Sequence, residues 1–218
     1  MAIEGFTEYA KEDRQKYNAM RWWLGMTWGD MFDKASDLYP DKVGLVDDMG
    51  RWTYSELRDK VDRLAISLIK LGINPRDWVL LQFPNWHEYI LAFFAMQKIG
   101  ALTVLLIPRH NQSEINHLCA LTKPVAWIVP SQYGKINNQP IIDDVLKENR
   151  QLKHIIQIRT PGNSRYPTLD EVIEKVELTM ENIRMLEEQR PDPDEVSHIM
   201  HTGGTTGLPK ASVRTHNS

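Results

Sequence analysis

Short apolar runs alternate with longer amphipathic segments along most of this 218-residue chain, and this alternation limits the possible folds. The runs are apolar at consecutive positions rather than at every second residue, which is typical of strands buried on both faces of a parallel sheet. Parallel neighbours need a crossover connection, so helices are expected between the runs. The buried strands are predicted at Val79–Phe83, Leu102–Ile107, Val125–Val129, His154–Ile158 and Val196–Met200.

The segments between these runs carry helical signals. In the longest of these segments, Ser55–Leu71, leucine, valine and alanine recur on one face, and Gly72 follows as a stop signal. Two short strands, Val43–Asp47 and Arg51–Thr53, are predicted around a turn at Asp48–Gly50. The fold class is therefore α/β, a largely parallel sheet flanked by helices. Helices are predicted from the cap Thr27 to Leu38, over Ser55–Leu71, from the cap Asn85 to Gly100, from Ser113, over Ile141–Asn149 and over Leu169–Leu186.

The N-terminal residues differ in character from the rest. The chain is polar up to Lys16, where an arm or a short helix is expected. It is then aromatic over Arg21–Trp28, where Trp22 and Trp23 are expected to be buried anchors. We therefore divide the chain into an arm at residues 1–26 and a main domain at residues 27–218. Residues 160–168 are either a linker or a surface loop.

Composition excludes several classes of protein. The net charge is −3, so no basic field favours nucleic acid as a partner. The longest apolar run is far shorter than the roughly 20 residues that span a bilayer, and the charged N-terminus does not resemble a signal peptide. The one cysteine, Cys119, excludes an internal disulfide framework and is expected to be a buried structural thiol. A cytoplasmic protein is expected.

The most informative motif is the segment Ile199–Lys210, which reads IMHTGGTTGLPK. Glycines let backbone N–H groups approach an anion, threonine hydroxyls add donors, and Lys210 adds a positive charge. The segment is not a Walker A motif, because Pro209 stands where that motif has glycine. These residues favour a loop that binds a triphosphate or pyrophosphate; a glycine-rich hairpin between two strands, without a ligand, is the alternative.

The order of residues in this segment resembles the phosphate-loop signature of the AMP-forming acyl-acid ligases, the adenylate-forming superfamily. That signature is an apolar residue, two free positions, and a Ser/Thr/Gly run that ends in Pro-Lys. Weaker similarities lie upstream, at residues 53–57 and 79–102, so the resemblance extends from about Thr27 to the end of the chain. It implies the fold of part of the large N-terminal domain of such an enzyme, ending just after the phosphate loop.

Three details resemble the branch of the family that activates aryl acids such as 2,3-dihydroxybenzoate. They are Gly203, where the broader family usually has serine, the tail Arg214–Asn217, and the segment at residues 105–120. Two positions depart from that pattern: His201 replaces the usual tyrosine or serine, and the pair at residues 211–212 is Ala-Ser.

The resemblance implies a two-step reaction. A carboxylic acid attacks the α-phosphate of Mg²⁺-ATP to give an acyl-adenylate, and the thiol of coenzyme A or of a phosphopantetheine carrier then displaces AMP. His216 would support the acid pocket, and no residue of this chain is assigned as catalytic or as a metal ligand. The residues implied to bind the ATP phosphates are Thr202, Gly203, Gly204, Thr205, Thr206, Gly207 and Lys210.

The later segments of such ligases, including the ribose-binding aspartate and the catalytic lysine, have no counterpart here. The chain is therefore expected to be an N-terminal part that is inactive alone, exposes the loop Gly203–Lys210, and self-associates weakly through an uncovered apolar face. A stand-alone, non-catalytic module that binds a nucleotide or a protein is the alternative.

Overall fold

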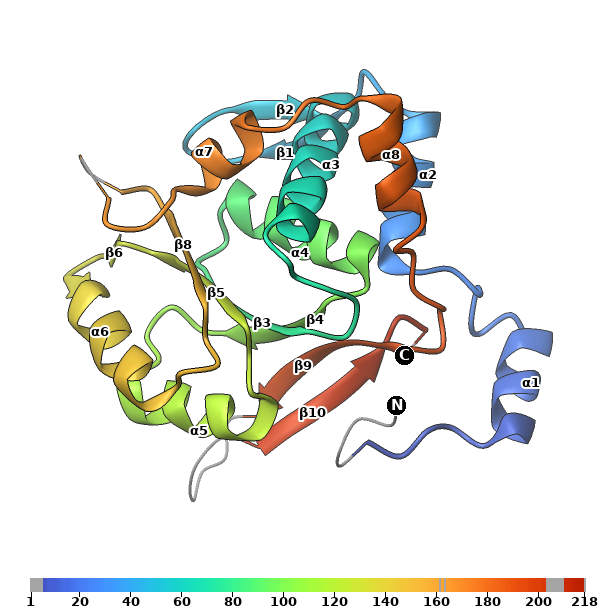
Figure 1. The fold of residues 1–218 in the computed structure, drawn as a ribbon. Helices are drawn as coiled ribbons and strands as arrows, with labels where there is room; N and C mark the ends of the chain where they lie inside the picture. The colour runs from blue at the N-terminus through green and yellow to red at the C-terminus, as the bar shows by residue number, and fades with distance from the viewer. Residues whose placement is uncertain (1–5, 161, 163, 203–209, 218) are drawn as a thin grey trace.

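The computed structural model describes residues 6–160, 162, 164–202 and 210–217, and a six-stranded sheet forms its centre (Figure 1). The strand order is β10-β9-β4-β3-β5-β8. All neighbouring pairs are parallel except β10 with β9, which is antiparallel. The strands are β3 (Trp78–Gln82), β4 (Leu102–Leu106), β5 (Ala126–Pro130), β8 (His154–Ile158), β9 (Val196–Thr202) and β10 (Lys210–Thr215). The predicted fold class is confirmed.

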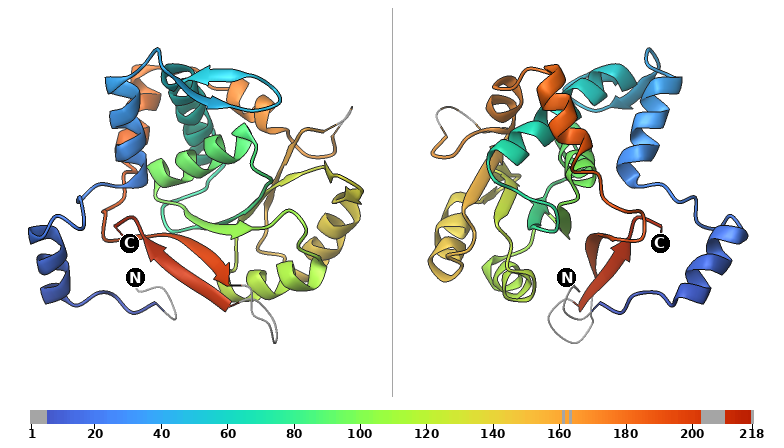
Figure 2. Two further views of the ribbon diagram at one scale, coloured as in Figure 1. Left: turned by 180° about the vertical axis from the view of Figure 1, so that it is seen from behind. Right: turned by 45° about the vertical axis from the view of Figure 1, so that its right-hand side comes forward.

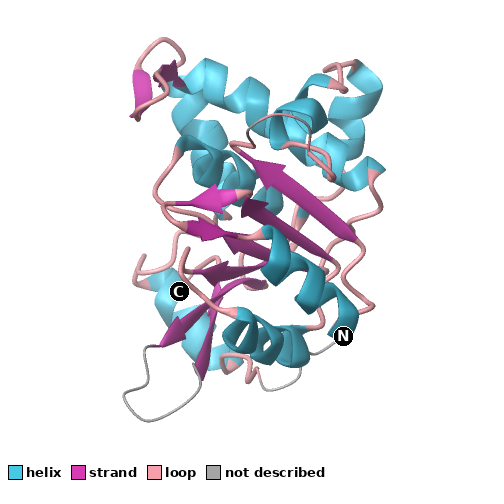
Figure 3. Cartoon of the chain, turned by 90° about the vertical axis from the view of Figure 1, so that its left-hand side faces the viewer, coloured by secondary structure: helices cyan, strands magenta, loops and turns pink. Residues whose placement is uncertain are grey.

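Helices cover both faces of this sheet, as Figure 3 shows. On one face, α3 (Tyr54–Lys70) and α4 (His87–Ile99) pack against residues such as Leu81 and Ile128. On the other face, α5 (Gln112–Thr122) and α6 (Gln139–Glu148) pack against Leu80 and Trp127. Successive strand residues thus enter different cores, which is why the strands are apolar throughout.

Local sequence signals explain where several helices begin and end. Thr27, Thr53 and Asn111 each form a reciprocal capping box with the residue three positions later, at the starts of α2 (Trp28–Leu38), α3 and α5. α4 ends at Gly100, whose φ of 68° lies in the left-handed region that glycine favours. The predicted cap Thr27 is confirmed, whereas the N-cap of α4 is Trp86 rather than Asn85.

The predicted helix over Leu169–Leu186 is wrong: two helices, α7 (Leu169–Glu174) and α8 (Met180–Glu187), occupy this region. Side chains of α3 account for the break. Ser67 donates a hydrogen bond to the carbonyl of Val172 at 2.7 Å, and Arg63 donates to that of Val176 at 2.5 Å. Thr179 then caps α8, its hydroxyl accepting from the N–H of Asn182.

The N-terminal arm agrees with its prediction in forming a short helix and differs from it in the exposure of Trp22. It contains a helix, α1 (Lys11–Ala19), that has no buried residue and stands out from the body beside the C-terminal end (Figure 2). Trp22 is not a buried anchor but is 61% exposed, and its ring lies 5.6 Å from that of Tyr17. Trp23 is half-buried. A domain boundary at residue 26 stays a prediction.

The remaining elements are small. The predicted strands near residue 45 are confirmed as β1 (Val43–Val46) and β2 (Arg51–Thr53), an antiparallel pair. A second antiparallel pair is formed by β6 (Gln132–Tyr133) and β7 (Ile136–Asn137).

Among the described residues, no helix combines the length and the apolar character needed to cross a membrane. Cys119 is buried, as predicted, and burial raises the pKa of its thiol to about 12. Self-association through the sheet stays a prediction.

Candidate functional site

The carboxyl ends of β3, β4 and β9 gather at one edge of the sheet. Leu81 lies opposite Leu105 in the ladder, and Leu105 lies opposite Met200, so the three strands end side by side. Ligands of open α/β sheets bind beyond this edge, where the loops that follow the strands converge. The edge is therefore the candidate site.

The two described ends of the predicted phosphate loop meet at this edge. β9 and β10 are antiparallel, and Thr202 pairs directly with Lys210. The Lys210 side chain is exposed. The other predicted phosphate-binding residues lie outside the described residues: Gly203, Gly204, Thr205, Thr206 and Gly207. The structure therefore places this segment between two antiparallel strands. The hairpin alternative predicted both strands, whereas the phosphate-loop interpretation predicted only the first.

A cleft of about 600 Å³ opens beside this frame. Its walls are largely aromatic and aliphatic, and its polar groups come from Asn85, Tyr89, Tyr133 and His201. A few polar groups on an apolar wall are typical of sites for small organic ligands. The lining residues are Phe83, Pro84, Asn85, Tyr89, Leu105, Leu106, Ile107, Pro108, Tyr133, Met200 and His201.

The cleft wall is braced by contacts behind it. The ring of Tyr89 lies 6.2 Å from that of Phe83 and 5.9 Å from that of Phe93. Trp86, next to the cleft residue Asn85, lies under the guanidinium of Arg159 at 3.9 Å. A cation held over an indole face is an attractive contact, so the start of α4 is fixed from outside the cleft.

Arg159 is also the centre of an ion-pair network that sequence analysis did not detect. It donates to Glu88 at 2.7 Å and to Asp47 at 3.0 Å, and Asp47 also lies 2.8 Å from His87 Nδ1. Hydrogen bonds from His87 help hold the pKa of Asp47 well below its usual range despite its burial. These residues come from the loop after β8, from α4 and from the β1–β2 turn, so no local motif reveals them.

Asp47, His87 and Glu88 could also be considered as metal ligands. Among the described residues they form a group whose potential ligand atoms lie within 4.8 Å of one another. The Arg159 guanidinium, however, already bonds to both carboxylates. A divalent cation would have to displace that charge, so the geometry favours an ion-pair network over a metal centre.

The structure separates His216 from the phosphate-loop frame. His216 follows Thr215, which pairs with Val196 at the opposite end of the seven-residue β9. A strand of that length spans roughly 20 Å. The His216 ring is buried, and its Nδ1 accepts a hydrogen bond from the N–H of Trp28 at 3.3 Å. His216 therefore fixes the start of α2, at the other edge of the sheet.

Burial of His216 makes stability depend on pH. Desolvation, followed by the charge of nearby His198, lowers the pKa of His216 from 6.5 to about 4. The unfolded chain therefore takes up this proton first, so stability falls as the pH drops from about 6.5 toward 4. At about pH 5 the cost is expected to be about 2 kcal/mol.

Denaturant unfolding of the wild type and of His216→Asn at about pH 7 and about pH 5 measures this cost. Asparagine retains an acceptor for Trp28 but does not titrate. The variant is expected to lose about 2 kcal/mol less than the wild type between the two pH values. An equal loss in both proteins would show that His216 is not the group responsible.

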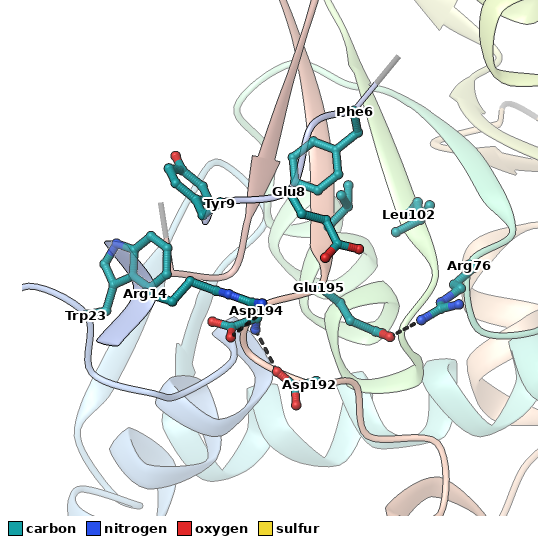
Figure 4. A pocket seen from close by; sticks show the side chains of 11 residues that line it. Phe6, Glu8, Tyr9, Arg14, Trp23, Arg76, Leu102, Asp192, Asp194 and Glu195 are labelled. Carbon is teal, nitrogen blue, oxygen red and sulfur yellow. Dashed lines mark hydrogen bonds and ion pairs between the residues drawn. The ribbon is translucent and has the colours of Figure 1, made fainter. Parts of the chain in front are cut away.

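A second cavity, of about 260 Å³, lies between the arm and the amino end of β9 (Figure 4). Arg14 of α1 pairs with Asp194 at 3.4 Å, and Arg76 pairs with Glu195. The charges that line this cavity thus include two ion pairs, one of which joins the arm to the body. The cavity lies at the opposite edge from the candidate site.

Comparison with known proteins identifies the family to which this chain belongs. A family model described as "AMP-binding enzyme" matches residues 32–218. The chain is 32% identical to triostin synthetase I of Streptomyces triostinicus and 31% identical to the 2,3-dihydroxybenzoate-AMP ligase of Bacillus subtilis, in each case over 99% of the chain. It spans 38% of the length of each of these relatives.

A solved structure agrees with these matches. The apo structure of MbtA from Mycobacterium smegmatis superposes with a TM-score of 0.83 at 28% identity, covering 98% of this chain and 38% of that protein. A complex of the anthranilate CoA ligase AuaEII with anthranoyl-AMP superposes with a TM-score of 0.78 at 19% identity. The match covers 89% of this chain and 35% of that one, and it shows that the two share a fold.

Proposed function

Because this chain belongs to the AMP-binding enzyme family, we propose that it is the N-terminal part of an ATP-dependent, AMP-forming ligase that activates an aryl acid. The observation that carries the proposal is the similarity, along almost the whole chain, to a ligase named for 2,3-dihydroxybenzoate. Relatives named for salicylate and for a substituted naphthoate support the same class of substrate.

The geometry of the candidate site suits such a substrate. The cleft offers aromatic and aliphatic walls for the ring of the acid, with Tyr89 and Tyr133 among the few residues there that carry a polar group. The paired ends of the phosphate loop, Thr202 and Lys210, stand at the same edge of the sheet. An acid bound in the cleft would thus direct its carboxylate toward nucleotide phosphates held at that edge.

In the proposed reaction, a carboxylate oxygen of the acid bonds to the α-phosphorus of ATP, and the bond to the pyrophosphate oxygen breaks. The thiol of coenzyme A or of a phosphopantetheine carrier then attacks the acyl carbonyl, and AMP leaves. Lys210 and the loop threonines would hold the leaving pyrophosphate, which is catalysis by positioning and electrostatics. Mg²⁺ would bind with the ATP phosphates and neutralise part of their charge.

His216 has at most an indirect role in this scheme. It lies at the other edge of the sheet and would support the acid pocket through the start of α2, where it accepts from Trp28. We place the reaction in the cytoplasm, where ATP and thiol acceptors are supplied.

The test is an exchange assay with radiolabelled pyrophosphate and ATP. The 218-residue chain alone is expected to give no exchange above background, because phosphate contacts without contacts to adenine, ribose and acid do not position the α-phosphate. The longest protein encoded by the reading frame is expected to exchange with 2,3-dihydroxybenzoate or salicylate and much less with octanoate.

Exchange by the chain alone would contradict its assignment as an incomplete part. If the reading frame encodes nothing beyond this chain, or if the longer protein activates no carboxylic acid, the non-catalytic module is the correct interpretation. A preference for octanoate would retain the ligase but reject the aryl acid as its substrate.

A further inference from the structure

The buried strand β3 ends on a polar residue, Gln82. The residues before it, Leu80 and Leu81, are apolar, and Gln82 is fully buried like them. It pairs with Leu106 at the last position of the parallel ladder, so it lies where β4 leaves the sheet. Burial of an amide costs free energy unless the amide makes hydrogen bonds. The partners of the Gln82 amide therefore indicate its role.

The amide of Gln82 donates into the turn that follows β4, at residues 107–110. Its Nε2 lies 3.3–3.4 Å from the carbonyl oxygens of Ile107, Pro108 and His110. Its Oε1 has no hydrogen-bond partner among the described residues, and the reversed amide would place that oxygen against the three carbonyls. The turn is also closed by a backbone hydrogen bond from His110 to Ile107 at 3.2 Å. The turn is thus built around a side-chain nitrogen of another strand.

This turn forms part of the wall of the candidate cleft. Ile107 and Pro108 line the cleft, and Ile107 is 49% exposed. At the other end of the turn, His110 is buried, and its ring centroid lies 4.6 Å from that of His201, a cleft residue on β9. The turn therefore carries two residues of the wall and contacts a third.

Other parts of the wall are held by different contacts. Tyr89 packs against Phe83 and Phe93 through its ring, and Trp86 beside the cleft lies under the guanidinium of Arg159. None of these contacts involves the turn at residues 107–110. A displacement of the turn would therefore change the width of the cleft on one side and leave the rest of its wall in place.

We propose that Gln82 is a positioning residue that fixes the width of the cleft through the turn at residues 107–110, and so determines the size of the aryl acid that is activated. This inference rests on the proposed function, because it assumes that the acid binds in the cleft. Gln82 does not itself line the cleft, so it acts on the acid only through the turn.

Loss of the amide would release the turn from β3. A methionine at position 82 fills similar space but offers no donor to the three carbonyl oxygens, and buried carbonyls without a donor are unfavourable. Phe83, next to Gln82, also lines the cleft. A turn released from Gln82 moves away from Phe83, and the cleft between Phe83 and Ile107 widens. A larger acid then gains relative to a smaller one.

The experiment compares two aryl acids of different size in the pyrophosphate exchange assay, with the longest protein that the reading frame encodes. The acids are salicylate and 3-hydroxy-2-naphthoate, which has a second fused ring. The measured quantity is the kcat/KM for salicylate divided by the kcat/KM for the naphthoate. Both values come from one preparation, so a variant that merely contains less folded protein loses both equally and keeps the wild-type ratio.

The ratio is expected to fall about tenfold in Gln82→Met. Gln97→Met is the matched control, because Gln97 is also buried but lies on α4 and does not line the cleft. Its Oε1 accepts from the hydroxyl of Ser197, near the amino end of β9. Gln97→Met removes a buried amide of the same size and is expected to keep the wild-type ratio.

Ile107→Ala tests the same wall without a change in the buried amide, and it decides the matter if Gln82→Met does not fold. Its ratio is expected to fall in the same direction, because the side chain that narrows the cleft is shortened. If the wild type gives no exchange with the naphthoate, the appearance of that exchange in the variants has the same meaning.

An unchanged preference in folded Gln82→Met, or in Ile107→Ala, would overturn the role of Gln82 and leave the proposed function intact. An equal fall in Gln97→Met would also overturn it, because the effect would then follow from the loss of any buried amide. A wild type that activates neither acid would contradict the proposed function, and this inference with it.

Discussion

Replacing Lys98 by methionine is expected to lower the free energy of unfolding by about 3–5 kcal/mol, because it removes the buried cation that Asp33 and Asp62 share. The Lys98 side chain is 3% exposed, and its Nζ lies 2.5 Å from Asp33 and in contact with Asp62. Burial raises the pKa of Asp62 even in the presence of the lysine. The three residues come from α2, α3 and α4, so this network joins the helices that cover one face of the sheet.

Lys147→Met is the matched control. Lys147 also pairs with an aspartate, Asp144 at 2.8 Å, but its side chain is 73% exposed. Exposed ion pairs contribute little to stability, so this variant is expected to unfold at nearly the same denaturant concentration as the wild type. Denaturant unfolding of both variants at about pH 7 measures the difference. Arg190 pairs with Asp33 at 2.7 Å, and Arg58 lies 3.7 Å from Asp33 and 3.8 Å from Asp62. A loss below about 1 kcal/mol in Lys98→Met would show that these two arginines compensate the carboxylates.

The alternation of apolar runs and helical segments was enough to predict the central sheet. Each parallel strand is buried on both faces, so its apolar character is visible in a single stretch of sequence, as at Val79–Phe83. The cap at Thr27 could also be predicted, because a capping side chain bonds to backbone groups no more than four positions away. Features that depend on neighbouring residues are thus the ones that the sequence reveals.

Features that depend on distant residues were missed. The break between α7 and α8 arises because side chains of α3, more than one hundred positions earlier, take the carbonyls of Val172 and Val176. The network around Arg159 joins residues up to 112 positions apart. The strand β10 was predicted only as part of the hairpin alternative, because its pattern of exposed and half-buried residues lacks a continuous apolar run.

The candidate site was predicted in part. The family signature singled out the segment and its lysine, whose roles stay predictions, and the structure pairs Thr202 with Lys210 at the edge where ligands are expected. The cleft beside them needs residues from α4, β4, β6 and β9 together, and the contact of His110 with His201 joins positions 91 residues apart along the sequence. Neither arrangement has a local signal.

Replacing Lys210 by alanine is expected to lower kcat/KM for ATP in the exchange assay by about 100-fold or more, because a charge is lost where the leaving pyrophosphate would be stabilised. Lys210 begins β10 and lies across the ladder from Thr202, so the hairpin places its charge at the end of the loop. Its side chain is exposed, and folding stability is expected to change by about 0.5 kcal/mol or less. The assay uses the longest protein that the reading frame encodes.

Lys153→Ala is the control for the charge that is removed with Lys210. Lys153 is also exposed, but it precedes β8 at the amino edge of the sheet, away from the loop. The net charge changes by the same amount in both variants, so a general effect of charge on the attraction of ATP would lower exchange equally. A specific phosphate contact lowers it in Lys210→Ala alone. Wild-type exchange in Lys210→Ala would refute the role assigned to this lysine, even if the cleft still selects an aryl acid.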